Sequence, residues 1–337
     1  MKTIFTINCE KSDSIGFIVG KLEKLVINNI WNVRINLKGF GLADMERANR
    51  MVDALKIVED KYQQSFNLFI DIPYPGNKCR IKTDEEVQQV GANEIFELCT
   101  LGSEMTGRYR RIQVSKSFFE DFSGSSEDTI YFGDGEGAFK IVQKISSHMW
   151  IIQSENQFEL LNNKSITGAI EKKELNTVQI EFLKFLKIKC HVAGVFLSFS
   201  ESSSELIRFK NIFKLDEKRF PVYAKIETQL GVDNIEDIIN VCDGVMVARG
   251  DLALYSTMNR YFFNKSKIVD CAREENKRLF IATDILSSLE HKNFPNRADL
   301  CDLHHIVEKK PYGIILKSDF FYYNRSEYAL KWISCIR

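Results

Sequence analysis

The sequence has few residues that break regular structure or link domains: 5 prolines and 18 glycines in 337 residues, with no Pro- or Gly-rich stretch. It has no excess of charge either, because 46 Lys and Arg residues balance 46 Asp and Glu residues. That balance argues against nucleic-acid binding by bulk charge. Apolar runs of about 18 residues are absent, and charges interrupt every apolar run near the N-terminus. We therefore expect a cytoplasmic protein without a signal peptide, and with no nucleic-acid or membrane partner.

The eight cysteines are scattered, and no two of them form a C-x-x-C pair. In a chain of this length, that spacing is typical of buried free thiols in a reducing compartment. The ligand spacing of a thiolate metal site is missing as well. We expect free thiols that take no part in metal binding.

What the sequence has in quantity is short apolar runs rich in β-branched and aromatic residues, most of them followed by a helical pattern. Three runs precede residue 73: "KTIFTIN", "NVRINL" and "FNLFIDI". Five follow residue 168: "VAGVFLSF", "FPVYAKIE", "GVMVARGD", "RLFIATD" and "YGIILKS". Strands alternating with helices indicate a parallel sheet with helical crossovers. Eight such units meet the requirement of a closed (β/α)8 barrel, so we predict an α/β TIM barrel.

The alternation is interrupted between residues 73 and 168. Pieces such as "CRIKT", "EIFELCTLG", "RRIQVSK" and "HMWIIQS" alternate apolar and polar residues and are separated by Ser- and Gly-rich turns. This period of two is typical of antiparallel strands. The predicted organisation is a barrel built from residues 1–72 and 169–337, with a small antiparallel β-domain inserted at 73–168.

Charged residues gather where two neighbouring strands end. Lys225 and Glu227 are two positions apart and face the same side of one strand, and Arg249 and Asp251 repeat this spacing on the next. The active site of such barrels lies at the carboxyl ends of the strands. One interpretation is a ring of salt bridges that closes the top of the barrel. The other is a carboxylate pair, Glu227 and Asp251, holding a hard cation such as Mg²⁺ beside a lysine that stabilises charge on a transferred group.

The segment "AKIETQLGVDNIEDIINVCDGVMVARGDLAL", residues 224–254, closely resembles the signature of the pyruvate kinase family. Five other stretches resemble that family in the same order along the chain: "KTIFTIN", "NVRINLKGFG", "LFIDI", "IYFGDGE" and "LFIATDILSSLEHKNFPNRADLCDL". The resemblance implies a barrel whose inserted β-domain closes over the active site as a lid. It also implies transfer of a phosphoryl group from phosphoenolpyruvate to ADP.

The resemblance further implies roles for individual residues, most of them taken from a matching motif position. The catalytic residues would be Lys225, Thr283 and Arg34, and the ligands of Mg²⁺ or Mn²⁺ would be Glu227 and Asp251. Substrate would be bound by Gly250, Arg249 and Ser198, and a monovalent cation by Asn36 and Asp71. The lid residues would be Asp134 and Lys164.

Three departures from the family pattern change these expectations. Lys38 stands where the family has a potassium-binding serine, so we expect that its ammonium replaces the ion and that potassium is not required. The segments "DIPYPGNKCRIKT", "LSFSESSSE" and "ILKSDFF" are rebuilt, which indicates a different acceptor, a different donor or weakened catalysis. The chain ends one helix after the eighth strand, so we expect no C-terminal regulatory domain and no tetramer of the familiar kind.

Three functions are compatible with these patterns. The first is a pyruvate kinase-like, metal-dependent phosphotransferase acting between phosphoenolpyruvate or pyruvate and ADP, ATP or a specialised acceptor. The second is a metal-dependent lyase or decarboxylase acting on a 2-oxo acid through a metal-bound enolate. The third is a non-catalytic homologue that binds a metabolite or a partner protein. Pyruvate formation, nucleotide-independent cleavage and ligand binding without turnover distinguish them.

Overall fold

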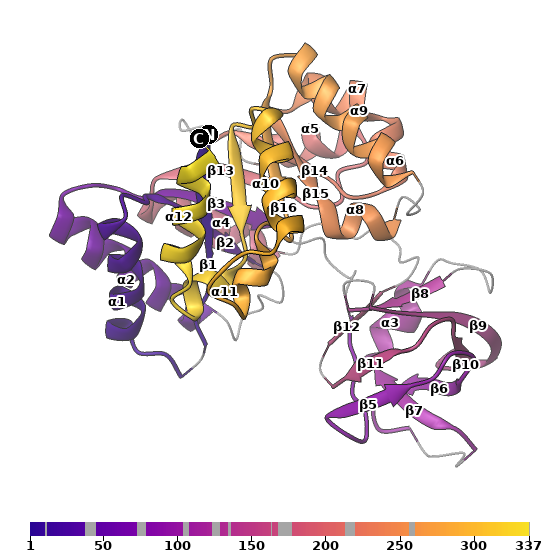
Figure 1. Ribbon diagram of the computed structural model, residues 1–337. Coiled ribbons are helices and arrows are strands. Elements are labelled where there is room, and N and C mark those ends of the chain that lie inside the picture. The colour runs from indigo at the N-terminus through magenta and orange to yellow at the C-terminus, as the bar shows by residue number, and fades with distance from the viewer. Residues whose placement is uncertain are drawn as a thin grey trace. The chain divides into compact units, whose positions relative to one another are not determined.

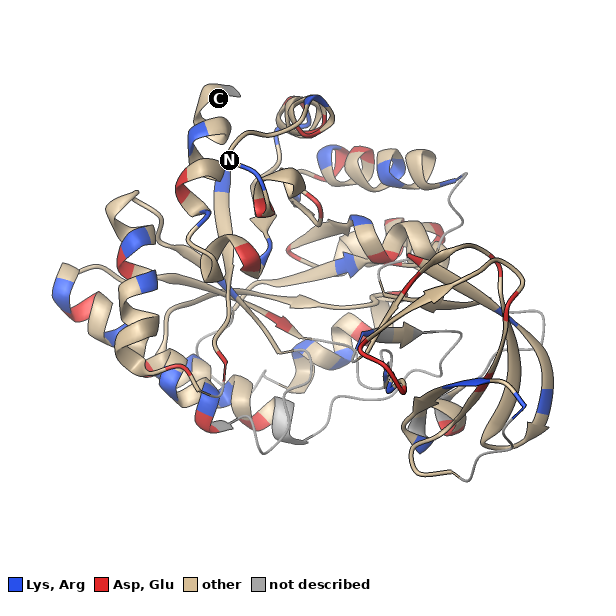
Figure 2. Ribbon diagram, turned by 60° about the horizontal axis from the view of Figure 1, so that its bottom comes forward, with Lys and Arg blue, Asp and Glu red and all other residues tan. Residues whose placement is uncertain are grey.

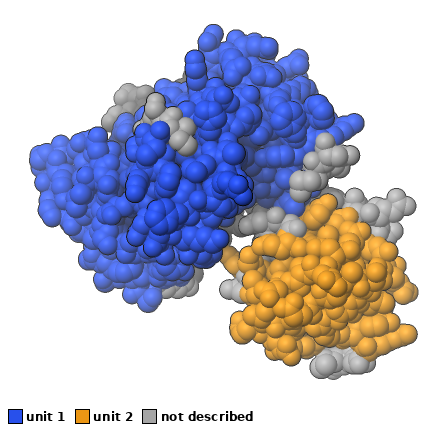
Figure 3. All heavy atoms as spheres, viewed as in Figure 1, with its two compact units in different colours: residues 1–73, 176–337 blue, residues 74–175 orange. Residues whose placement is uncertain are grey.

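The computed structural model describes residues 1–10, 12–37, 45–72, 79–103, 108–122, 129–133, 136–162, 164–167, 177–212, 220–255 and 260–336. The chain divides into two compact units (Figure 3). Unit 1 comprises residues 1–73 and 176–337, and unit 2 comprises residues 74–175. The domain boundaries predicted near residues 73 and 168 fall at positions outside the described residues. They stay predictions.

Unit 1 is a closed barrel of parallel strands (Figure 1). Within the described residues, the order around the barrel is β1, β17, β16, β15, β14, β13, β3, β2 and back to β1. The predicted α/β TIM barrel is therefore confirmed. Its strands are β1 (Lys2–Ile7), β2 (Asn32–Asn36), β3 (Asn67–Ile72), β13 (Val192–Leu197), β14 (Val222–Ile226), β15 (Gly244–Ala248), β16 (Arg278–Ala282) and β17 (Gly313–Leu316).

Helices follow the barrel strands, as the alternating pattern predicts. Capping side chains begin three of them: the N–H groups of Phe17 (3.2 Å), Gly231 (3.1 Å) and Asp299 (2.7 Å) donate to the side chains of Ser14, Thr228 and Asn296, respectively. The helices are α1 (Ile15–Ile27), α2 (Met45–Tyr62), α4 (Thr177–Lys189), α5 (Ser203–Ile212), α6 (Gln229–Asp233), α7 (Ile235–Val241), α8 (Arg249–Tyr255), α9 (Tyr261–Glu274), the 3₁₀ helix η2 (Ser287–Glu290), α10 (Arg297–Glu308), α11 (Ser318–Tyr322) and α12 (Ser326–Ile336).

Aromatic rings fill the interior of the barrel. Phe69 on β3 contacts Phe280 on β16 with ring centroids 5.9 Å apart, although three strands separate β3 from β16 in the barrel order. Phe196 and Tyr223 complete the cluster, with centroids 4.9 and 4.6 Å from that of Phe280. All four side chains are fully buried, so this layer is a packed core rather than a channel.

Unit 2 is a small β-domain with its own core. Its larger sheet has the order β4, β12, β8, β9, β10, β6, β7, and every pair is antiparallel except β6 with β7, which the sequence did not indicate. A separate pair, β5 with β11, is antiparallel. The elements are β4 (Cys79–Arg80), β5 (Val87–Val90), β6 (Ile95–Thr100), β7 (Arg110–Val114), α3 (Lys116–Asp121), β8 (Thr129–Phe132), β9 (Gly137–Ser146), β10 (Met149–Ser154), β11 (Phe158–Leu161) and β12 (Ser165–Thr167).

The distribution of surface charge and the state of the cysteines can be compared with what the composition predicted. Basic and acidic residues are interspersed along the outer helices of unit 1 (Figure 2). Among the described helices, none combines the length and the apolar character that crossing a membrane would require. All eight cysteines are free, as expected, but not all are buried, because Cys301 and Cys335 are exposed on α10 and α12.

Candidate active site at the carboxyl end of the barrel

Polar side chains replace the aromatic ones towards the carboxyl ends of the barrel strands. Asp71 comes two residues after Phe69 on β3, and Lys225 comes two residues after Tyr223 on β14. Alternate residues of a strand face the same side, so both charged groups lie in the barrel interior, one layer above the aromatic cluster. Asp71 is 1% exposed and Lys225 is 8% exposed.

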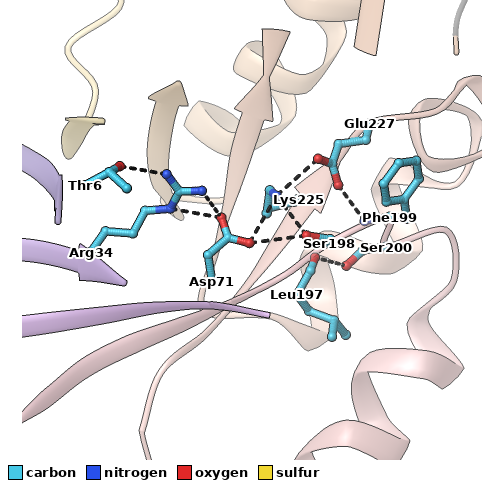
Figure 4. Close-up of polar contacts among 9 residues, drawn as sticks. All are labelled: Thr6, Arg34, Asp71, Leu197, Ser198, Phe199, Ser200, Lys225 and Glu227. Atoms are coloured by element: carbon cyan, nitrogen blue, oxygen red, sulfur yellow. Dashed lines mark hydrogen bonds and ion pairs between the residues drawn. The ribbon is translucent and has the colours of Figure 1, made fainter. Parts of the chain in front are cut away.

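Asp71 binds two cationic side chains at once (Figure 4). Its Oδ2 accepts hydrogen bonds from Nε (3.0 Å) and Nη2 (2.6 Å) of Arg34. Its Oδ1 accepts from the hydroxyl of Ser198 (3.3 Å) and from Nζ of Lys225 (3.2 Å). Lys225 also donates to Ser198 Oγ (2.8 Å), and Nη1 of Arg34 donates to Thr6 Oγ1 (2.8 Å). The network joins strands that are distant in sequence and fixes both cations.

Opposite charges decide the protonation states of this network. Burial alone would raise the pKa of the Asp71 carboxyl, but the charges of Arg34 and Lys225 outweigh it and hold the pKa below its ordinary value. Burial alone would lower the pKa of the Lys225 ammonium, but Asp71 and Glu227 outweigh it and raise that pKa. At neutral pH Asp71 is therefore ionised and Lys225 is protonated.

Glu227 follows β14 directly and is almost completely buried. Its Oε2 accepts a hydrogen bond from the backbone N–H of Phe199 (2.6 Å), and its Oε1 lies 3.1 Å from Nζ of Lys225. Burial raises the pKa of this carboxyl to about 7, Lys225 opposes the rise, and the nearby charge of Asp251 adds to it. Two carboxylates that repel each other in this way favour a cation between them.

The chemistry of the carboxylate pair fits a hard divalent cation. Glu227 and Asp251 offer only oxygen atoms, which Mg²⁺ prefers, and this metal commonly uses one or two protein carboxylates and completes its shell with water or substrate oxygens. A larger cage is not seen, since no group of three or more His, Cys, Asp or Glu residues suited to a metal occurs in the described part of the chain. When all five groups are ionised, the carboxylates of Glu227, Asp251 and Asp71 exceed the cations of Lys225 and Arg34 by one negative charge.

Arg249 and Asp251 do not continue a strand, so that expectation is wrong. β15 ends at Ala248, and both residues lie in the first turn of α8. Residues two apart on a helix point in different directions. Nη1 of Arg249 donates to both carboxylate oxygens of Asp302 (2.6 and 2.7 Å), away from the Lys225 network. The other interpretation, a ring of salt bridges at the top of the barrel, is met in part. Arg34, Asp71, Lys225 and Glu227 form a chain of ion pairs, whereas Arg249 pairs with Asp302.

Thr283 directly follows β16 and has an unusual backbone. Its φ angle is +75°, a region that β-branched residues rarely adopt. The backbone of α8 approaches it closely, because a Cβ atom at Gly250 would lie 3.0 Å from Cγ2 of Thr283. A side chain at position 250 would therefore displace Thr283.

Four predicted site residues remain, and the structure describes two of them. Asn36 is the register partner of Asp71 across β2 and β3. Lys164, in unit 2, forms an exposed ion pair with Glu136 (3.1 Å). Lys38 and Asp134 lie outside the described residues. The roles predicted for all four stay predictions.

Three contributors to the site have little or no signal in the sequence. Thr6 could have been found, since it comes two residues after the interior Ile4 on β1 and so faces the lumen. The backbone N–H of Phe199 and the carboxylate of Asp302 could not. A backbone donor has no sequence signature, and Asp302 lies within a helix 53 residues beyond Arg249.

We expect Asp71→Asn to destabilise the protein by about 3 to 5 kcal/mol, because it leaves the buried Lys225 and the half-buried Arg34 with one counter-charge fewer. Chemical denaturation at pH 7 measures this. The pKa of Asp71 is depressed in the folded state, so its contribution is complete above its unfolded value of about 3.9 and is lost as the pH falls below it. The difference between wild type and variant should shrink in acid. A constant difference down to pH 2 would contradict the assignment.

Comparison with known proteins shows what the chain is similar to. Residues 2–317 match the family model described as pyruvate kinase, barrel domain. The chain is 23% identical over 291 residues to the pyruvate kinase of Thermotoga maritima, a match that covers 85% of this chain and 60% of that protein. It is 29% identical over 284 residues to the pyruvate kinase of Kluyveromyces lactis, covering 82% of this chain and 55% of that protein. The chain therefore spans about 55 to 60% of the length of these relatives.

Proposed function

Since the chain belongs to the pyruvate kinase family, we propose that it is a metal-dependent phosphotransferase. It would move a phosphoryl group between phosphoenolpyruvate or pyruvate and ADP, ATP or a specialised acceptor. The observation that carries this proposal is the ammonium of Lys225, buried at the carboxyl end of the barrel between Asp71 and Glu227. A lysine in that place suits a reaction in which negative charge moves between oxygens.

Lys225 would stabilise the phosphoryl group during its transfer. Such transfers depend almost entirely on positioning and on electrostatic stabilisation of the phosphoryl oxygens. The ammonium is held by Asp71, Ser198 and Glu227, so it needs little reorganisation when charge develops. Its raised pKa keeps the positive charge in place at neutral pH.

Glu227 and Asp251 are the residues that would hold Mg²⁺ or Mn²⁺. When bound, such a metal supplies positive charge that neutralises the substrate oxygens and orients them. The hydrogen bond from the N–H of Phe199 restricts the orientation of the Glu227 carboxylate. The like charge of Asp251, which opposes ionisation of Glu227, becomes favourable once a cation lies between the two.

Arg34, Thr283 and Gly250 would act on the substrate from neighbouring strand ends. Arg34 is oriented by Asp71 and Thr6 and would contact a phosphate oxygen. Thr283 would lie near the carbon atom that gains or loses a proton. The close approach of α8 at Gly250 would let a backbone N–H reach the carboxylate of the substrate.

A coupled assay of pyruvate formation tests the proposal. Purified protein is supplied with phosphoenolpyruvate, Mg²⁺ or Mn²⁺, and ADP or another acceptor, and pyruvate is expected with at least one acceptor. Loss of carbon dioxide from oxaloacetate without nucleotide would favour the decarboxylase instead. Stabilisation by ligand without turnover in either assay would favour a binding protein.

We expect the activity to be independent of potassium. Lys38 stands where the family has a potassium-binding serine, so its ammonium would supply the charge that a monovalent cation otherwise brings. Exchanging 100 mM of a potassium salt for the same tetramethylammonium salt is expected to change kcat by less than about twofold, since the ionic strength stays constant. A loss of most of the activity without potassium would refute this expectation.

A further inference from the structure

Arg249 uses its guanidinium group on the protein itself. At one end, Nη1 donates to both oxygens of the Asp302 carboxylate on α10 (2.6 and 2.7 Å). At the other end, Nε donates to the carbonyl oxygens of Ala282 (3.2 Å) and Thr283 (3.0 Å), and Nη2 donates to the same Thr283 oxygen. Arg249 is 9% exposed. The side chain therefore links the end of β16 to α10 and directs three of its nitrogen atoms at protein oxygens.

The carbonyl group that Arg249 holds belongs to a strained segment. Thr283 has φ +75° and the following Asp284 has φ +51°, both in the left-handed region. Non-glycine residues persist in such conformations only when the surrounding structure imposes them. Three contacts do so here: Arg249 holds the Thr283 carbonyl, Gly250 packs against its methyl group, and Lys317 pairs with Asp284 (2.8 Å).

We propose that Arg249 and Asp302 form a clamp that positions Thr283 for the reaction, and that Arg249 does not bind the substrate itself. The planar fork of a guanidinium can hold a carboxylate with one edge and backbone carbonyls with another, which an ammonium cannot do. Asp302 fixes the direction of this fork. The clamp rests on the proposed function insofar as Thr283 serves the proton transfer at the substrate carbon.

Steady-state kinetics of Arg249→Lys and Asp302→Asn test the clamp. Displacing a reacting group by about 1 Å can lower a rate about 100-fold, so we expect kcat to fall about 10- to 100-fold in both variants. The KM for phosphoenolpyruvate should stay within about twofold, because no substrate contact is removed. The double variant should be no worse than the poorer single variant, because both act through one structure. The matched control is Arg273→Lys, which alters an exposed pair with Asp270 on α9.

Amide hydrogen exchange tests the same clamp without any catalysis. We expect a peptide covering residues 280–290 to exchange faster in both variants than in wild type, with no change in a peptide from α1. A raised KM with unchanged exchange in Arg249→Lys, and a nearly normal Asp302→Asn, would show instead that Arg249 contacts substrate and would overturn the clamp. Wild-type kinetics and wild-type exchange in both variants would overturn it as well.

The two proposals fail in different ways. If wild-type protein forms no pyruvate with any acceptor, the proposed phosphotransferase function is wrong, and exchange alone decides the clamp. Faster exchange in both variants then supports it, and unchanged exchange overturns it. Circular dichroism of each variant confirms that it is folded, and Asp302→Asn, at a partly exposed position, preserves the shape of the side chain.

Discussion

Replacing Lys225 by methionine is expected to lower kcat about 1000-fold, the upper range for removing one group that stabilises transition-state charge. The methionine side chain has nearly the same length but no charge, and the site at the carboxyl end of the barrel excludes most water around it. A missing charge in a buried site is not replaced by solvent. The measurement is the rate of pyruvate formation at saturating phosphoenolpyruvate and metal.

The fold should survive this substitution. Asp71 keeps its two hydrogen bonds from Arg34, and Glu227 can take up a proton because its pKa is already near 7. The control is Lys184→Met on α4, which removes an exposed lysine paired with Glu181 and should leave kcat unchanged. If Lys225→Met retains more than about a tenth of the wild-type kcat, Lys225 does not stabilise the transferred group as proposed.

Loss of either carboxylate of the pair is expected to abolish metal binding and activity together. For Glu227→Gln and Asp251→Asn we expect kcat/KM to fall about 1000-fold or more, since a metal ion supplies several kcal/mol of charge stabilisation. Titration with Mn²⁺, followed by electron paramagnetic resonance, should show the free ion at concentrations that saturate wild type. The control is Glu236→Gln, at an exposed position on α7. If both variants bound Mn²⁺ with wild-type affinity, Glu227 and Asp251 would not be the metal ligands.

Although Glu227→Gln is expected to abolish activity, it is not expected to lower the free energy of unfolding of the metal-free protein at high pH. In metal-free protein the pKa of Glu227 is raised to about 7, above its unfolded value, so the folded state binds a proton more tightly than the unfolded state. Its ionisation therefore lowers stability as the pH rises from about 4.3, the unfolded value, towards 7. Glutamine cannot ionise, so the metal-free variant should be at least as stable as wild type at pH 8. Adding Mn²⁺ should stabilise wild type and not the variant.

The amino-acid sequence by itself was sufficient to predict the barrel and the end of the barrel at which its charges lie. Alternating strand and helix patterns indicated eight units, and a period of two put Lys225 and Glu227 on the same face of one strand. The insertion was likewise visible as a change of period, although the parallel pairing of β6 with β7 was not. Local backbone geometry determines these features, so a window of a few residues contains the information.

Only the tertiary structure decided which partners these charges have. Asp71 is 37 residues from Arg34 and 154 from Lys225, and closure of the barrel makes it the shared counter-ion of both. Arg249, expected at the mouth of the barrel, lies in the first turn of α8 because β15 ends one residue earlier, and Asp302 holds it there. The raised pKa of Glu227 likewise comes from burial and from Asp251 on another element. Such pairings depend on which segments, distant in the sequence, come together in space. Hydrophobic periodicity along the chain does not encode this.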